Sequence, residues 1–161
     1  MPASHANAAG AAPIELVVSR LIDAPRALVF KAWTQQEHAA RWWGPRGVTV
    51  ESCRLDATQG GTYRVAMRSP DGTVRTKRGV YQEVVAPERL VFTYAWEDAD
   101  GNPGHTMHIT VTFEARGEQT LLTLRQTGFE DIPERDGHRS GWTSCFERFA
   151  DYMLTAKATM R

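Results

Sequence analysis

The chain has 161 residues, 42% of them hydrophobic, and its 19 basic residues balance 19 acidic ones. A chain without net charge has no overall field to attract nucleic acid or an anionic membrane surface, so neither partner is expected. No stretch approaches the roughly 20 apolar residues of a membrane span, so the sequence predicts no membrane insertion and a cytoplasmic location.

Residues 1–13 are expected to form a disordered tail. The run is rich in alanine but has neither a basic start nor a continuous apolar block, so it does not fit a signal peptide. Residues 14–161 fit a single domain, because a chain of this size can bury roughly two thirds of its unfolded surface without disulfides or metals. The only two cysteines, Cys53 and Cys145, are expected to be buried free thiols.

The first elements along the chain are a strand and two short helices. Alternating apolar residues over 14–22 predict the strand. Asp23 and Pro25 end it and open a helix through Trp33. A second short helix should run from about residue 35 to 43, because Gly44 and Pro45 do not continue a helix well.

Residues 47–127 read as an antiparallel meander of six strands, because short alternating runs are separated by turn residues. A two-residue turn at Asp71-Gly72 would set Tyr63 opposite Val80 and place Arg78 on the inner face. Pairing through the later turns predicts inner rows that share a face. These rows contain Tyr94, Met107 and Gln126; Gln82, Phe92, Ile109 and Leu124; and Arg78, Trp96 and His105.

The last long element is an amphipathic helix over residues 132–157. Asp131 before Pro133 is a plausible start signal. Gly137 and Gly141 lie one turn apart, and each costs roughly 1 kcal/mol relative to alanine in a helix interior, which suggests that another group closely approaches this backbone. The apolar arc of about 120° contains His138, Trp142, Cys145, Phe146, Phe149, Tyr152, Met153 and Ala156.

These elements predict an α+β fold with a cavity. Seven strands at ~4.8 Å spacing make a sheet roughly 34 Å wide, whereas a helix is only ~10–12 Å across. The sheet must therefore curl around the last helix, with the two short helices closing one end. Where side chains do not fill the remaining space, a pocket for a small molecule is expected.

This order of elements resembles the helix-grip fold of the START-like SRPBCC superfamily, and more closely the family related to the activator of the heat-shock chaperone ATPase. The resemblance covers about residues 14 to 157. It implies the fold and a habit of holding hydrophobic or aromatic small molecules between sheet and last helix. The motifs that carry it are RLIDAP at 20–25, VFKAWT at 29–34, RWWGP at 41–45, Gly60-Gly61 with Tyr63, residues 79–90 with Val84, Pro87 and Leu90, and His138-x-x-Gly141-Trp142.

Candidate ligand contacts are the aromatic and polar side chains that the predicted inner face brings together. His138 could bond a ligand or act as a general base, or it could simply bond a neighbouring loop. Arg78 could hold a ligand carboxylate, or it could be a solvated strand residue. The tryptophans could equally be ordinary core filling. The full set is Trp33, Trp42, Trp43, Tyr63, Arg78, Tyr94, Trp96, His105, Met107, Gln126, His138, Trp142 and Phe146.

Neither a metal nor a cofactor is predicted. His105 and His108 point to opposite faces of a strand, and the cysteines lack the paired spacing of a zinc site. Cys145 and His138 are separated by about 10 Å along a helix, too far for a nucleophilic pair.

Three hypotheses follow for function. The first is binding of a hydrophobic or aromatic small molecule. The second is an enzyme, such as a cyclase, dehydratase or hydrolase, that acts on a hydrophobic substrate with His138, His105 or Tyr94 as acid or base. The third, a chaperone interaction, rests on the family name alone and is not expected, because a single domain leaves no room for a further chaperone-binding domain. The residues leave homodimer formation open.

Overall fold

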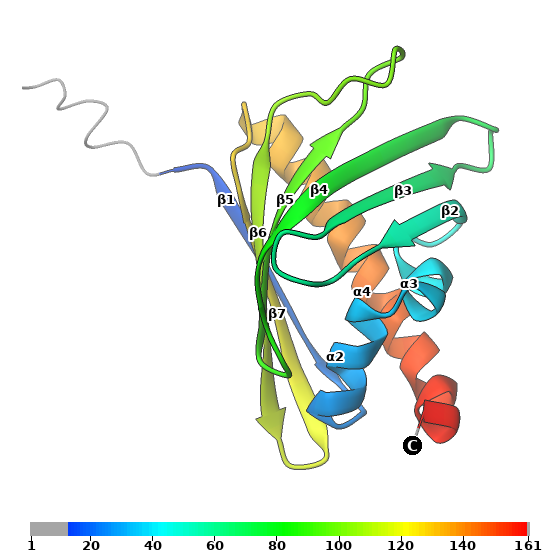
Figure 1. Ribbon diagram of the computed structural model, residues 1–161, viewed down its shortest axis with the longest axis vertical. Helices are drawn as coiled ribbons and strands as arrows, with labels where there is room; N and C mark the ends of the chain where they lie inside the picture. Colours follow the sequence, from blue (N-terminus) through cyan, green and yellow to red (C-terminus); the bar gives the residue numbers. More distant parts are fainter. Residues whose placement is uncertain (1–12, 161) are drawn as a thin grey trace, which may run out of the picture.

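The computed structural model describes residues 13–160, so residues 1–12 of the tail predicted over residues 1–13 lie outside this range. The α+β fold and the predicted order of elements are confirmed (Figure 1). The elements are β1 (Glu15–Ile22), α2 (Arg26–Thr34), α3 (Gln36–Trp42), β2 (Thr49–Leu55), β3 (Thr62–Arg68), β4 (Val74–Val85), β5 (Arg89–Trp96), β6 (Met107–Arg116), β7 (Gln119–Thr127) and α4 (Ile132–Met160).

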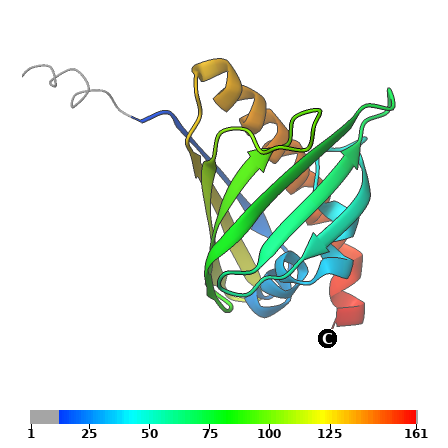
Figure 2. The same cartoon turned by 45° about the horizontal axis from the view of Figure 1, so that its top comes forward.

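The seven strands form one antiparallel sheet in the order β1-β7-β6-β5-β4-β3-β2. β1 returns to pair with β7, while α2 and α3 lie in the connection between the two edge strands, β1 and β2. The long helix α4 runs along the inner side of the curved sheet (Figures 1 and 2). This is the helix-grip arrangement that the sequence predicts.

The start of α4 is fixed by its predicted cap. The backbone N–H of Glu134 donates to Asp131 Oδ1 at 2.8 Å, which satisfies one of the free donors of the first turn. Pro133 lies in that first turn, where its missing N–H costs nothing. The helix extends to Met160.

Aromatic side chains fill the interior where α2, α3 and α4 meet. Trp33 is 2% exposed, and its ring lies within 6.3 Å of six other aromatic rings. The Trp42 indole N–H donates to the Ala32 carbonyl at 3.0 Å. This end of the interior is therefore closed by the protein's own side chains, which include Trp33, Trp42, Phe113, Phe146 and Phe149.

The predicted register of the β3–β4 hairpin is wrong by one residue. The Ser69 N–H donates to the Thr73 carbonyl at 2.8 Å, so the loop contains three residues, and Gly72 supplies the positive φ of 91°. Tyr63 therefore pairs with Gly79 and not with Val80. The one-residue difference turns Arg78 to the outer face of the sheet and Lys77 to the inner face.

The remaining registers agree in part with the prediction. Tyr94 pairs with Met107, as expected. Gln126 pairs with Ile109 rather than Met107, a two-residue difference that keeps its side chain on the same face. Phe92 lies opposite Tyr81, and not opposite Gln82, because the register shifts between Tyr81 and Glu83. The inner face is thus still apolar and aromatic along β5 to β7.

Within the described residues, none of the helices is both long enough and apolar enough to cross a membrane. A cytoplasmic location stays a prediction from the sequence. Of the two free cysteines, Cys145 is buried and Cys53 is half-buried.

Candidate ligand-binding site

A cavity of about 410 Å³ lies between the first half of α4, the inner faces of β3 to β5 and the segment that follows α3. It occupies the end of the interior that the aromatic cluster around Trp33 leaves open. Its lining is mostly apolar, with a small number of charged groups. The lining residues are Trp43, Gly44, Pro45, Val48, Met67, Ser69, Arg75, Lys77, Tyr94, Trp96, Pro133, Glu134, Gly137, His138, Gly141, Trp142 and Cys145.

Gly137 and Gly141 give the cavity its depth along α4. A Cβ built on either glycine meets no atom within 4 Å, so no other described residue packs against the helix at these two positions. The expected close approach of another group to this backbone is therefore wrong for the described residues. The two glycines instead leave open the space that larger side chains would occupy, at a cost to helix stability.

The segment 44–48, which forms one wall, is attached to α4 by polar contacts. Arg148 Nη1 donates to the carbonyls of Gly44, Pro45 and Val48 at 3.4, 3.2 and 2.8 Å. The Arg46 N–H donates to Ser144 Oγ at 2.9 Å. These contacts fix the wall relative to the helix that carries the glycines.

Lys77 lies inside the cavity and is only 2% exposed. Its Nζ stands 4.3 Å from the centroid of the Trp43 ring, 5.3 Å from that of Tyr94 and 5.5 Å from that of Trp142. Cation–π attraction of this kind partly replaces lost hydration. Burial lowers the pKa of Lys77 from 10.5 to about 7, because a desolvated amine favours its neutral form.

Arg75 is a second cation on the same face of β4. It is exposed at the edge of the cavity, and its guanidinium carbon lies 3.8 Å from the centroid of the Trp96 ring. The strand therefore carries one basic group at the mouth of the cavity and one inside it.

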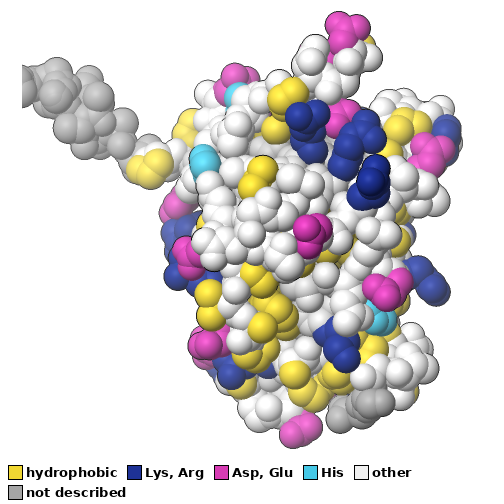
Figure 3. Space-filling model, viewed as in Figure 1, with side chains coloured by type: hydrophobic (Ala, Val, Ile, Leu, Met, Phe, Trp, Pro, Cys, Tyr) yellow, Lys and Arg dark blue, Asp and Glu magenta, His cyan; other side chains and the backbone are white. Residues whose placement is uncertain are grey.

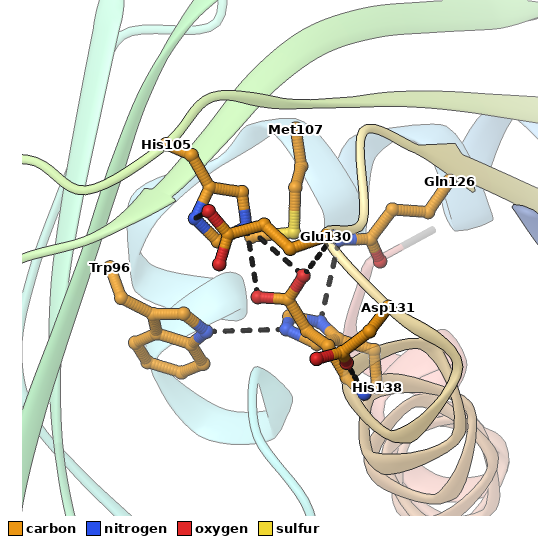
Figure 4. Close-up of polar contacts among 8 residues, drawn as sticks. Trp96, His105, Met107, Gln126, Glu130, Asp131 and His138 are labelled. Carbon is orange, nitrogen blue, oxygen red and sulfur yellow. Dashed lines mark hydrogen bonds and ion pairs between the residues drawn. The ribbon is translucent and has the colours of Figure 1, made fainter. Parts of the chain in front are cut away.

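His138 lies between two side-chain donors (Figure 4). The Trp96 indole N–H donates to His138 Nε2 at 3.3 Å, and the Gln126 amide nitrogen lies 3.4 Å from His138 Nδ1. Burial lowers the pKa of His138 to about 4 despite the nearby Glu134 carboxylate. A neutral ring can accept the Trp96 hydrogen bond at Nε2, whereas an imidazolium, which donates from both nitrogens, would face a donor on each side.

Gln126 is held in place by contacts with Trp142 and Met107. It is completely buried, and its Oε1 accepts a hydrogen bond of 2.8 Å from the Trp142 indole N–H. Its amide nitrogen lies 3.3 Å from the sulfur of Met107. Gln126 and Met107 therefore stand behind the cavity wall and support His138 and Trp142.

His105, Glu130 and Glu134 bring three ligand-type atoms within 4.8 Å of one another. His105 Nε2 lies 2.9 Å from Glu134 Oε2, and the Glu130 N–H donates to Glu134 Oε1 at 2.8 Å (Figure 4). The cluster thus joins the loop before β6 to the first turn of α4. Glu134 alone of the three lines the cavity.

The model of the family described as "Activator of Hsp90 ATPase homolog 1-like protein" matches residues 23–153. The chain belongs to this family. It therefore falls within the START-like SRPBCC superfamily, as its motifs indicate.

Solved structures agree with this assignment. The AHSA1 protein from Silicibacter pomeroyi is 26% identical, with a TM-score of 0.80 over 88% of this chain and 98% of that one. A protein from Chromobacterium violaceum is 26% identical, with a TM-score of 0.77 over 85% and 94%. The AHSA1-like protein from Aeromonas hydrophila, at 21% identity, shares the fold with a TM-score of 0.71 over 89% and 94%. No curated protein matches the chain.

In this protein, the predicted ligand contacts other than Arg78 separate into three groups. Those that line the cavity are Trp43, Tyr94, Trp96, His138 and Trp142. Those that lie in the core or behind the wall are Trp33, Trp42, Tyr63, Met107, Gln126 and Phe146. His105 does not line the cavity but pairs with Glu134, which does.

Arg78 is the predicted ligand contact that lies on the opposite face of the sheet. Arg64 and Arg78 both pair with Glu97, at 2.7 and 3.6 Å, on the outer side of the sheet. Basic side chains gather over this part of β3 and β4 in Figure 3. Arg78 is therefore part of the outer surface, which was the second of the two sequence interpretations.

Lys77, Arg75 and the open side of α4 were not among the predicted contacts. A signal for the two basic residues is present in the sequence. The run Ser-Pro-Asp-Gly-Thr over 69–73 places proline first and glycine last within a three-residue loop. That loop length sets Arg75 and Lys77 on the inner face.

Proposed function

We propose that this protein binds a hydrophobic or aromatic small molecule in the cavity between the sheet and α4. The observation that carries the proposal is the open space above Gly137 and Gly141, bounded by the rings of Trp43, Tyr94 and Trp142. Its volume of about 410 Å³ falls in the range of small-molecule sites, which are roughly 300–1,000 Å³ and mostly apolar with a few polar groups. Domains of this family and superfamily are typically ligand-binding.

The catalytic alternative has less support from the three acid–base candidates. His138 is a weak base because its pKa is lowered to about 4. Burial raises the pKa of Tyr94, so its hydroxyl stays protonated at neutral pH. His105 pairs with Glu134 outside the cavity lining. The binding hypothesis therefore agrees better with the arrangement of these side chains than the enzyme hypothesis does.

The proposal does not include a chaperone as partner. The family's description refers to an activator of the Hsp90 ATPase, whereas the features described above form a cavity for a small molecule. A pull-down with purified chaperone at micromolar concentration is expected to retain no protein, and retention would contradict this part of the proposal.

Nuclear magnetic resonance titration of the full chain with a panel of aromatic and lipidic compounds tests the binding proposal. Binding compounds are expected to shift the indole N–H signals of Trp43 and Trp142 and the backbone signals of Gly137 and Gly141. Signals on the outer face of β1 and β7, such as Ser19, serve as the control. The proposal fails if no compound in the panel moves the cavity signals.

A further inference from the structure

We propose that the ligand of this cavity is an organic carboxylate with an aromatic or apolar body, and that its carboxylate pairs with the ammonium group of Lys77. This inference rests on the proposed function, because it names the chemical class of the molecule held in the same cavity. It goes beyond that function in requiring a negative charge on the ligand.

The first observation is that Lys77 lacks a counter-ion. Among residues 13–160, no carboxylate lies within 4.0 Å of its Nζ, and the amine makes no hydrogen bond. Among the described residues, the faces of three aromatic rings lie 4.3 to 5.5 Å from the amine. Because ring faces compensate only part of the lost hydration of an ammonium group, the site gains most from a partner that brings a negative charge.

The second observation is the sign of the charges around the cavity. Arg75 and Lys77 both contribute basic groups from β4, and Arg75 has no ion-pair partner among the described residues. Glu134 is the one carboxylate in the lining, and it already lies 2.9 Å from His105. The lining therefore presents more positive than negative charge, which favours an anion.

The third observation concerns the ligand's body. Trp43, Trp142 and Met67 surround the approach to Lys77 with apolar surface. A small inorganic anion would leave this surface in contact with water. An anion with an attached ring system would cover the apolar walls while its carboxylate reaches the amine.

Pairing with an anion also couples binding to protonation. Burial holds the pKa of Lys77 at about 7 in the free protein, and a bound carboxylate would raise it. Below pH 7 the amine is already charged, so its contribution to affinity is constant. Above pH 7 binding must take up a proton, and affinity should fall as the pH rises.

The other titratable groups that face Lys77 do not reproduce this profile. Cys53 from β2, Tyr94 from β5 and Cys145 from α4 have pKa values raised by burial, so they stay neutral near pH 7. His138, also from α4, has a pKa lowered to about 4. Arg75, on the same face of β4, is the other basic group of the cavity. A His105→Gln variant controls for the remaining histidine, which contacts the lining through Glu134.

Isothermal titration calorimetry tests the inference with 2-naphthoic acid and 4-phenylbenzoic acid, each compared with its primary amide. The acid should bind the wild type roughly 10- to 100-fold more tightly than the amide at pH 6.5, in keeping with a charge-assisted hydrogen bond. In Lys77→Met this preference should disappear. The matched control is Arg78→Met, which removes a positive charge from the outer face of the same strand and should keep the preference.

A second measurement does not depend on any variant. At pH 8, the heat of binding the acid should change with the ionisation enthalpy of the buffer, corresponding to uptake of nearly one proton, and the amide should show no such change. His105→Gln should keep the uptake.

The two proposals fail in different ways. Equal binding of acid and amide to the wild type, without proton uptake, would overturn the carboxylate inference and leave the proposed function standing. Absence of binding by both acids, both amides and the wider panel would remove the proposed function itself.

Discussion

Two effects oppose each other at the amine of Lys77. Burial favours the neutral form, whereas the faces of Trp43, Tyr94 and Trp142 favour the charged form. The first effect is larger, since the pKa falls from 10.5 to about 7. A residue that lowers stability in this way is typical of a site kept for binding rather than for folding.

Replacement of Lys77 by methionine should therefore stabilise the protein. Each pKa unit corresponds to about 1.4 kcal/mol, so the shift from 10.5 to about 7 predicts a gain on the order of 3–5 kcal/mol in the free energy of unfolding at pH 6–7. Urea unfolding of the wild type and of Lys77→Met measures it.

The stability difference between the variant and the wild type should depend on pH, and its direction follows from the shift in pKa. The folded-state pKa lies below the unfolded one, so the unfolded wild type binds more protons between pH 7 and about 10. Raising the pH through this window should stabilise the wild type relative to the variant, by roughly 1.4 kcal/mol per pH unit. A gap that stays constant from pH 6.5 to 9.5 would show that Lys77 keeps an ordinary pKa.

At the scale of elements, α4 has two parts with different roles. Its second part buries Phe146, Phe149 and Met153 in the core. Its first part carries Gly137 and Gly141, which face open space. The same helix therefore packs tightly at one end and leaves room for a ligand at the other.

This division predicts opposite effects on stability and binding at Gly141. Gly141→Ala should raise the free energy of unfolding by about 0.5–1 kcal/mol, because alanine favours the helix and its Cβ meets no atom within 4 Å. Gly141→Leu should fill the cavity and weaken binding of 2-naphthoic acid at least tenfold. Urea unfolding and calorimetry measure the two effects.

The matched control is Ser140→Leu, because Ser140 is exposed and does not line the cavity. It adds a similar volume on the outer side of α4 and should leave affinity unchanged. Unaltered affinity in Gly141→Leu would mean that the ligand lies elsewhere.

At the scale of the whole molecule, aromatic residues serve two purposes in two regions. Trp33 is almost fully buried, and its six neighbouring rings connect α2 with β6, with α4 and with the end of α3. Trp96 is half-buried at the cavity and bonds His138. The filled region stabilises the curved sheet and thereby holds the open region in shape.

Two leucine variants should separate these purposes. Trp33→Leu should lower the free energy of unfolding by roughly 2–4 kcal/mol, because it leaves a void among tightly packed rings. Trp96→Leu should lower it by about 1 kcal/mol or less but weaken binding of the aromatic acids several-fold. Equal losses of stability in the two variants would contradict the division into a filled and an open region.

The sequence by itself determined the elements and the fold. Alternation, turn residues and the cap at Asp131 are local signals, and a wide sheet over one helix must curve. It did not predict the three-residue β3–β4 loop, because the Asp71-Gly72 pair also suits a two-residue turn. One residue of register decided whether Lys77 or Arg78 enters the interior.

Only the tertiary structure decided where packing stops. Trp33, Trp42, Trp43 and Trp142 look alike in a sequence, yet two fill the core and two line the cavity. Gly137 and Gly141 likewise suggest either a close contact or an open space until the neighbouring elements are placed. The reason is physical: whether a side chain fills a gap depends on which distant residues surround it, and local sequence does not encode that distance.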